Sequence, residues 1–166
     1  MLGYKEISPL LEVVGNHLHW KTSSGGRIAG RRAGCLKNNG YITVMLLGKF
    51  YQAHRLIWLL TYGVWPPSHV DHINGDRSDN RISNLRLCSQ LQNNQNKSLA
   101  TNNKSGFKGV FYRAHSRKYQ ALITVNGIQK YLGRYERAED AARVYDAACI
   151  EFFGAYAKPN FPVNAS

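Results

Sequence analysis

Cysteine is scarce in this sequence, and its three cysteines are never close together. Cys35, Cys88 and Cys149 form no CxxC pair, so neither a zinc knuckle nor a disulfide framework is expected. No apolar run reaches the roughly 18 residues that a membrane-spanning helix needs. Met1 to Pro9 also lacks the apolar segment of a signal peptide. These absences predict an intracellular protein with reduced thiols and no membrane partner.

Acidic residues are also few. The 166 residues include 10 Asp and Glu against 22 Lys and Arg, which gives a formal net charge of +12. This balance favours a polyanionic partner, because each phosphate that Lys or Arg neutralises releases a condensed counterion. A basic globular protein with no such partner is the alternative that charge alone leaves open. The length accommodates one domain or two small ones.

The first part of the chain has the pattern of a small antiparallel sheet. Residues 10–21 alternate around Gly15-Asn16, which predicts a hairpin. Residues 41–46 are strongly β-prone and turn into a second run at 50–53. Between these segments lies a basic cluster that is either a phosphate-contacting arm or a solvated loop: Arg27, Arg31 and Arg32.

A short helix is expected next. Residues 54–62 change to a helical period, and Gly63 is a natural end for that helix. His54 stands at the helix start beside apolar positions. It is interpreted as a structural histidine and not as part of a site.

The polar stretch that follows is the most informative part of the sequence. Residues 70–73 predict a short strand that ends at the turn-forming Asn74-Gly75-Asp76. Residues 84–88 predict a second strand. The S-x-x-Q pattern of 89–92 is typical of a capping box, so a helix should begin at Ser89.

This stretch contains the groups that phosphodiester hydrolysis requires. An imidazole, with an ordinary pKa of about 6.5, can take a proton from the attacking water. Carboxylate and amide oxygens can hold a hard cation that stabilises the leaving 3′-oxygen. Asp71 and His72 are neighbours, so both can serve one site only if the strand ends or bulges there. The alternative is an Asx-rich turn in which these side chains satisfy backbone groups. That loop role is preferred for Asp76, Asp79 and Asn80.

The strings VDHINGDRSDNRISNLR and QNNQN closely resemble the HNH endonuclease family, in the ββα-metal form found in phage and intron-borne homing endonucleases. The upstream string GYITVMLLGKFYQAHRLIWLLTYG resembles the N-terminal part of the same proteins. The resemblance implies that His72 is the general base and that Asn84 orients its imidazole and steadies the loop. It also implies that Asp71 and Asn93 hold one divalent ion, Mg²⁺ or Mn²⁺. Asn93 occupies the third motif position in place of His, so the metal would have oxygen ligands only.

A different unit is expected beyond a polar linker at 101–105. It has three β-prone runs, 107–113, 119–125 and 128–135, and the last two join through Asn126-Gly127, a type I′ hairpin signal. That turn predicts a register that pairs Val125 with Ile128, Ile123 with Lys130 and Ala121 with Leu132.

The alternation along these strands predicts two unlike faces and a covering helix. The predicted apolar face consists of Ala121, Ile123, Val125, Ile128 and Leu132, and the opposite face of Gln120, Leu122, Thr124, Gln129 and Tyr131. A helix over 136–153, closed by Gly154, should cover the apolar face with the stripe Ala138, Ala141, Ala142, Tyr145, Ala148 and Phe152. Residues 101–134 contain seven Lys and Arg and no acid, whereas 135–153 contain two Lys and Arg and five acids. A positive sheet backed by a negative helix favours a sheet-first approach to DNA.

The strings FKGVFYR, KYLGRY, AEDAARVYDAACIEFFG and KPNFP resemble the plant apetala/ethylene-response-factor (AP-two/ERF) DNA-binding domain. The resemblance implies that the sheet lies in the major groove. The DNA-facing residues carried over by position are Lys108, Arg113, His115, Thr124, Gln129 and Tyr131. Phe111, Leu122 and Thr124 stand where plant members carry charged residues, so phosphate contacts should take a larger share of binding. The alternative is a small module used only for packing.

Together these observations predict an α+β protein: a ββα-metal nuclease module at 1–100, a linker at 101–105 and, at 106–166, a three-stranded antiparallel sheet packed on one helix. The predicted function is that of a metal-dependent, homing-type endonuclease acting on double-stranded DNA, with one divalent ion and no small-molecule cofactor. The predicted location is the cytoplasm of a phage-infected bacterial host. Two alternatives remain: a non-catalytic DNA-binding regulator and an RNA-acting nuclease.

Overall fold

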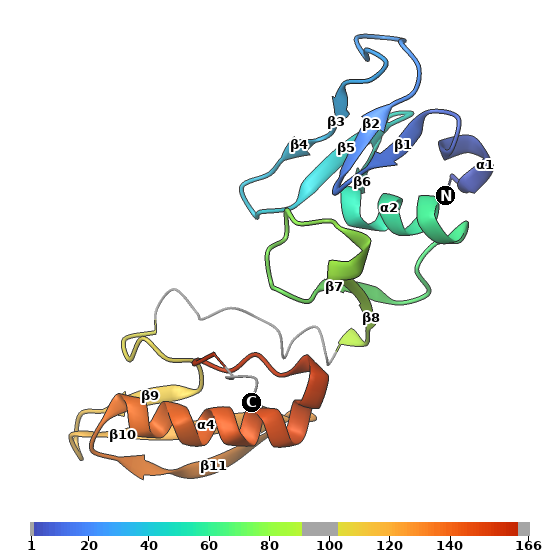
Figure 1. Ribbon diagram of the computed structural model, residues 1–166. Coiled ribbons are helices and arrows are strands. Elements are labelled where there is room, and N and C mark those ends of the chain that lie inside the picture. Colours follow the sequence, from blue (N-terminus) through green and yellow to red (C-terminus); the bar gives the residue numbers. More distant parts are fainter. Residues whose placement is uncertain (1, 91–102, 163–166) are drawn as a thin grey trace. The chain divides into compact units, whose positions relative to one another are not determined.

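The structure, a computed structural model, describes residues 2–90 and 103–162. The chain divides into two units, Met1–Ser89 and Gln90–Ser166, which are described separately (Figure 1). Antiparallel sheets and a small number of helices make up both units, so the predicted α+β class is confirmed. No helix in the described parts is both long enough and apolar enough to cross a membrane.

The N-terminal unit combines small antiparallel sheets with one main helix. The elements are α1 (Tyr4–Ile7), β1 (Leu11–Val14), β2 (His17–Trp20), β3 (Arg32–Ala33), β4 (Cys35–Leu36), β5 (Ile42–Leu46), β6 (Lys49–Gln52), α2 (Ala53–Tyr62), β7 (His69–His72), the 3₁₀ turn η1 (Ile82–Asn84) and β8 (Leu85–Cys88). They form the sheets β1-β2-β3 and β4-β5-β6 and the pair β7-β8. The predicted hairpin around Gly15-Asn16 and the predicted strand at 41–46 are confirmed. The strand predicted at 50–53 is confirmed as far as Gln52, and Ala53 begins α2.

Helix α2 links these sheets through one apolar core. Its buried side chains Leu56, Ile57 and Leu59 lie in the same cluster as Val70 of β7 and Leu85 of β8. Fully burying a side chain of this size stabilises the fold by roughly 1.5–3 kcal/mol. The helix ends at Gly63, whose φ of 76° allows its N–H to donate to the carbonyl of Leu59. The core thus fixes the β7-β8 pair against α2.

The β7-β8 pair sets the register of the polar stretch. Asp71 lies opposite Arg86 and His72 lies opposite Leu85. Beyond it, Gln90 has helical backbone. The rest of the helix predicted to begin at Ser89 lies outside the described residues, and so does Asn93.

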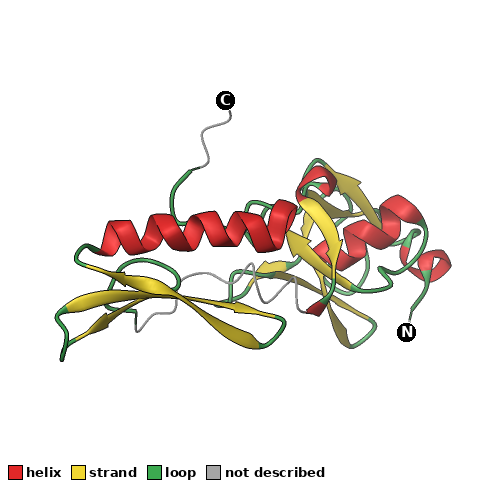
Figure 2. Ribbon diagram, turned by 90° about the horizontal axis from the view of Figure 1, so that it is seen from below, coloured by secondary structure: helices red, strands yellow, loops and turns green. Residues whose placement is uncertain are grey.

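The C-terminal unit is a three-stranded sheet with a helix along one face, as Figure 2 shows. The elements are β9 (Val110–Arg113), β10 (Lys118–Val125), β11 (Ile128–Tyr135), α4 (Ala138–Phe153) and the 3₁₀ turn η2 (Gly154–Tyr156), and the sheet order is β11-β10-β9. Asn126 and Gly127 both have positive φ, 52° and 81°, as a type I′ turn requires. The predicted hairpin is confirmed.

The predicted register holds only near the turn. Val125 pairs with Ile128 and Ile123 pairs with Lys130, but Ala121 lies opposite Gly133 and not Leu132. The prediction for Ala121 was wrong because a β-bulge between Ala121 and Leu122 shifts the ladder by one residue.

Two further predictions of burial were also wrong. Ile128, beside the turn, is 68 % exposed, and Phe152 is 38 % exposed with the ammonium of Lys130 over its ring. The apolar side chain that α4 buries at this end is that of Phe153.

Polar side chains tie the two ends of the C-terminal unit to its core. Of the predicted linker, Thr101 and Asn102 lie outside the described residues, while Ser105 Oγ donates to the carbonyl of Val110 at 2.8 Å. At the other end the buried Asp146 of α4 accepts hydrogen bonds from the backbone N–H groups of Asn160, at 2.7 Å, and Phe161, at 2.9 Å. The segment after α4 is therefore fastened to the helix.

Candidate active site

The end of strand β7 brings two polar side chains into the interior. Asp71 and His72 are 8 % and 3 % exposed. The strand stops at His72, because the N–H of Ile73 donates to the carbonyl of Asn84 and the N–H of Gly75 donates to that of His72. A buried imidazole thus stands where a regular strand gives way to a polar loop.

His72 is held by an amide on one side and by aromatic rings on another. A hydrogen bond of 2.9 Å joins its Nε2 to Oδ1 of Asn80, a residue that is 1 % exposed. The His54 ring meets the His72 ring edge to face, with centroids 5.0 Å apart. Tyr41 lies within 6.1 Å of the His72 ring and 5.4 Å of the His54 ring.

His54 is a residue whose place beside His72 the sequence analysis missed. It is 3 % exposed, and burial, with a smaller contribution from neighbouring His72, lowers its pKa to about 3. His54 is therefore neutral at physiological pH. The sequence feature that could have indicated this contact is a histidine among the apolar positions at the start of a short helix.

The loop between β7 and β8 is braced by amides. Asn84 Oδ1 accepts from the backbone N–H of Asn74 at 3.0 Å, and Asn84 Nδ2 donates to Asn74 Oδ1 and to the carbonyl of Asp79, at 3.0 and 2.8 Å. The amide bonded to the His72 imidazole through Nε2 is that of Asn80. The sequence places Asn80 among the loop residues, because spacing alone does not distinguish it from them.

The two acidic residues of the loop bond within the loop. Asp79 accepts from Arg81 Nε and Nη2 at 2.9 and 2.6 Å and from Asn74 Nδ2 at 2.9 Å. The bonds from Arg81 lower the pKa of Asp79 to about 2. Asp76 accepts from the hydroxyl and backbone N–H of Ser78, and these bonds lower its pKa. Both carboxylates stay ionised and brace the loop.

Asp71 forms an ion pair across the strands. Its Oδ2 accepts from Arg86 Nη2 at 2.9 Å and from Arg86 Nε at 3.1 Å. A carboxylate oxygen is the ligand type that Mg²⁺ prefers, so Asp71 fits the predicted role, while its predicted partner Asn93 lies outside the described residues. Within 2–90 and 103–162 no three His, Cys, Asp or Glu side chains group as a metal site. An Asp–Asn ligand pair does not depend on such a group.

The predicted DNA-facing residues of the C-terminal unit lie on or near the open face of the sheet. Thr124 pairs with Gln129 across β10 and β11, and Tyr131 is 58 % exposed. Arg113 is exposed and donates to Gln120 at 2.6 Å. His115 is exposed in the turn between β9 and β10.

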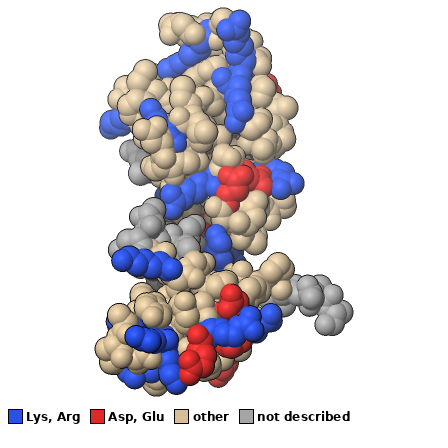
Figure 3. All heavy atoms as spheres, turned by 90° about the vertical axis from the view of Figure 1, so that its left-hand side faces the viewer, with Lys and Arg blue, Asp and Glu red and all other residues tan. Residues whose placement is uncertain are grey.

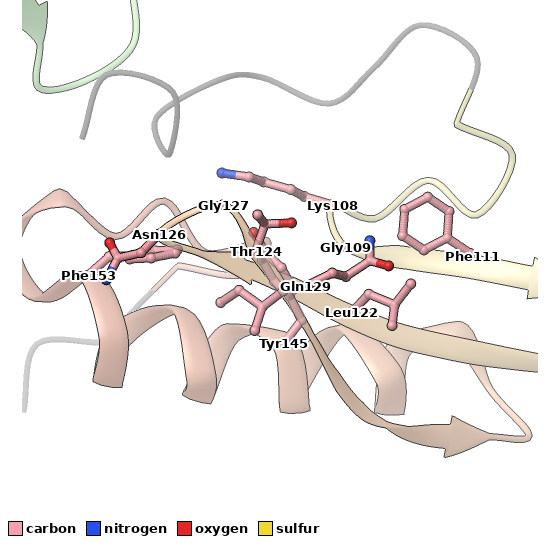
Figure 4. A pocket seen from close by; sticks show the side chains of 11 residues that line it. Lys108, Gly109, Phe111, Leu122, Thr124, Asn126, Gly127, Gln129, Tyr145 and Phe153 are labelled. Atoms are coloured by element: carbon pink, nitrogen blue, oxygen red, sulfur yellow. The ribbon is translucent and has the colours of Figure 1, made fainter. Parts of the chain in front are cut away.

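A cavity of about 330 Å³ opens in this sheet, and three of the six predicted residues line it (Figure 4). These are Lys108, Thr124 and Gln129, and the apolar side chains of Phe111 and Leu122 lie with them. Lys108 is half-buried, and burial lowers its pKa. The structure therefore brings cationic, polar and apolar groups to one hollow.

Charge is separated between the layers of the C-terminal unit. In Figure 3, Lys and Arg gather along one side of this unit, and the Asp and Glu side chains lie on its other side among further basic residues. The acids Glu139 and Asp140 begin α4, where the positive end of the helix dipole favours them. The sheet is left as the basic layer.

Comparison with known proteins connects the polar stretch with one family. Residues 51–95 match the family model described as HNH endonuclease. An uncharacterized HNH endonuclease of Acanthamoeba polyphaga mimivirus is 36 % identical over 127 residues, which cover 75 % of this chain and 65 % of the relative. The chain thus spans less than two thirds of that protein.

Two further relatives match parts of the chain. Protein 3.8 of Escherichia phage T7 is 28 % identical over 101 residues, which cover 58 % of this chain and 84 % of the phage protein. An ethylene-responsive transcription factor of Medicago truncatula is 39 % identical over 77 residues, which cover 45 % of this chain and 32 % of the plant protein.

Proposed function

We propose that this protein is a metal-dependent endonuclease of the homing type that hydrolyses phosphodiester bonds in double-stranded DNA. The match of residues 51–95 to the HNH endonuclease family model supports the proposal. The observation that carries the proposal is the buried His72 at the end of β7, bonded through Nε2 to Asn80. An imidazole fixed in this way is prepared to act as a general base.

The proposed reaction follows from these groups. His72 takes a proton from a water molecule as the water oxygen forms a bond to phosphorus. The bond from phosphorus to the 3′-oxygen breaks, and the leaving oxygen gains a proton from solvent. Asp71 and Asn93 would hold a divalent cation, Mg²⁺ or Mn²⁺, which when bound stabilises the charge on the leaving oxygen. Asn84 keeps the loop in place through its bonds to Asn74 and Asp79.

The C-terminal unit would supply the hold on DNA. Its described residues up to Arg134 carry seven Lys and Arg and no acid, and Thr124, Gln129 and Tyr131 are exposed on its sheet. The part of the chain around the active site is much less basic, with five Lys and Arg and three acids in 51–100. Tethering the sheet to the nuclease domain raises the local concentration of target DNA at His72.

The test compares His72→Ala with wild type on plasmid DNA, with Mg²⁺ and with a chelator. We expect the variant to lose about 10²- to 10⁴-fold in cleavage rate, the usual contribution of a general base, and to bind DNA as wild type does. His69→Ala is the matched control, because His69 is an exposed histidine at the start of the same strand. It should cut normally.

The other outcomes identify the alternatives. Scission by His72→Ala at the wild-type rate contradicts the assignment of the base. Binding without any metal-dependent product in wild type favours a DNA-binding regulator. Faster cleavage of RNA than of DNA favours an RNA-acting nuclease.

A further inference from the structure

We propose that Asn80 is a positioning residue, which fixes the His72 imidazole in the tautomer with the proton on Nε2 and the basic lone pair on Nδ1. The proposal rests on the proposed role of His72 as the base of the nuclease reaction. It adds a residue to that reaction, because the role of orienting the imidazole was assigned to Asn84.

The first step is the direction of the hydrogen bond. The atom of Asn80 that lies 2.9 Å from His72 Nε2 is the carbonyl oxygen Oδ1. A carbonyl oxygen only accepts, so Nε2 must carry the proton. In a neutral imidazole the other nitrogen, Nδ1, then holds the lone pair that can receive a proton.

The second step concerns the hydrogen bonding of the amide nitrogen of Asn80. Asn80 Nδ2 is buried and has no hydrogen-bond partner. The side chain of Asn80 is therefore held in the interior through its oxygen, by the hydrogen bond to His72 Nε2.

The third step is how the chain holds Asn80. Asn84 fixes the backbone on both sides of it: Asn84 Nδ2 donates to the carbonyl of Asp79, and the Asn84 N–H donates to the carbonyl of Arg81, both at 2.8 Å. Asn84 thus acts on the imidazole through Asn80. The His54 ring packs against the His72 ring from the side, and so limits how far the ring can turn.

The fixed tautomer matters because a general base must present its lone pair to the water in every catalytic cycle. An imidazole that exchanges between tautomers presents an N–H at that place part of the time. In a well-studied serine protease, removing the acceptor that fixes a catalytic histidine lowers kcat by about 10⁴-fold.

Two variants separate the oxygen of Asn80 from its bulk. Asn80→Asp keeps an acceptor beside Nε2, while Asn80→Leu keeps a similar volume and accepts nothing. Asn38→Leu is the matched control, because Asn38 is exposed in a loop of the same unit. All are made in the full chain.

The decisive measurement is long-range ¹H–¹⁵N NMR of the imidazole, without metal or DNA, with the His72 signals identified by their loss in His72→Ala. We expect a protonated Nε2 and an unprotonated Nδ1 in wild type, Asn80→Asp and Asn38→Leu, and mixed tautomers in Asn80→Leu. In single-turnover cleavage we expect Asn80→Leu to lose at least about tenfold, a part of the general-base contribution. Asn80→Asp should stay within about threefold of wild type.

Several results overturn the proposal. One is a proton on His72 Nδ1 in the wild-type protein, a result that does not depend on whether any variant folds. Another is Asn80→Asp behaving as Asn80→Leu does, and a third is Asn80→Leu keeping the single tautomer. If the wild-type protein has the expected tautomer but cuts no DNA, the nuclease function is contradicted, while the effect of Asn80 on the His72 tautomer stands. A protein that cleaves DNA but carries the His72 proton on Nδ1 supports the nuclease function and contradicts the role of Asn80.

Discussion

The two units place their polar side chains in opposite ways. Among the described residues, the buried polar and charged side chains of the N-terminal unit are His54, Asp71, His72, Asp79, Asn80 and Asn84. The C-terminal unit buries one, Asp146. All but His54 of the first group lie within the β7-loop-β8 segment, so burial of polar groups is concentrated at the proposed active site.

The difference fits the tasks we propose for the units. Acid–base chemistry requires groups that are held still, and burial together with hydrogen bonds to neighbouring side chains provides this. Recognition of DNA requires polar groups that a large partner can reach. The C-terminal unit accordingly has an apolar interior, in which Val110, Ile123, Tyr145, Cys149 and Phe153 lie with several alanines. It exposes Thr124, Gln129 and Tyr131.

The largest effect on stability is expected from breaking the buried ion pair. Arg86→Met should destabilise the N-terminal unit by about 3–5 kcal/mol, because it removes the guanidinium that pairs with the buried Asp71 carboxylate. The side chains of the pair are 16 % and 9 % exposed. Tryptophan fluorescence during urea unfolding, in a chelating buffer, reports on this unit alone, since Trp20, Trp58 and Trp65 all belong to it.

The C-terminal unit provides a matched exposed pair. Lys118 and Glu136 are 2.7 Å apart with side chains 44 % and 74 % exposed. Lys118→Gln should change stability by less than about 1 kcal/mol, as measured by amide hydrogen exchange in α4. Equal losses for the two pairs would contradict the contrast between a buried polar interior and an exposed polar surface.

The next effect on stability is expected at Gly109, where the backbone of the C-terminal unit lies close to the Tyr145 ring. Gly109 has φ of 75°, and an added Cβ would overlap the Tyr145 ring and lie 2.8 Å from the carbonyl of Leu122. Gly109→Ala should cost about 2–4 kcal/mol, from the left-handed backbone together with overpacking. Hydrogen exchange in α4 measures the loss.

Gly106→Ala separates these two causes. Gly106 has φ of 78° and nothing within 4 Å of an added Cβ, so its variant carries the backbone strain without the clash. We expect Gly106→Ala to lose no more than about 1–2 kcal/mol. Equal losses at the two positions would show that packing against Tyr145 does not limit the C-terminal unit.

The sequence predicts most of the local structure, because turns and periodicity are encoded by neighbouring residues. Asn126-Gly127 specifies a type I′ turn through the positive φ of both residues, and Asn74-Gly75 ends β7 where the site needs it. The register beyond Ala121 was not predictable in this way. A bulge depends on how a strand packs as a whole, and hydrophobic alternation does not record an extra residue.

The candidate site is less predictable than the fold for a similar reason. Asp71, His72 and Asn84 stand out by motif spacing, and their catalytic and metal-binding roles remain predictions, as does that of Asn93. The contacts of His72 with Asn80 and His54 are formed across a loop and between α2 and β7. Nothing in the spacing of a helix-start histidine or of an Asn in a polar loop distinguishes such contacts from ordinary structural ones.

A pH-dependent effect tests whether the polar interior of the N-terminal unit depends on a neutral His54. The pKa of His54 is about 3 in the folded chain and 6.5 for an ordinary histidine. Between these values the unfolded chain binds a proton that the folded chain does not. The contribution of neutral His54 to the free energy of unfolding is therefore fully present above about pH 6.5. It is lost as the pH falls towards 3, by up to about 1.4 kcal/mol per pH unit.

His54→Leu removes this group and keeps a similar volume beside Tyr41 and His72. We expect the slope of unfolding free energy against pH, between pH 4 and 6 and by tryptophan fluorescence, to fall by about 1 kcal/mol per unit relative to wild type. His69→Leu, at an exposed position, should leave the slope unchanged. Identical slopes for wild type and His54→Leu would mean that His54 takes up its proton in the folded state, and that the imidazole pair is open to water and not part of a closed polar interior.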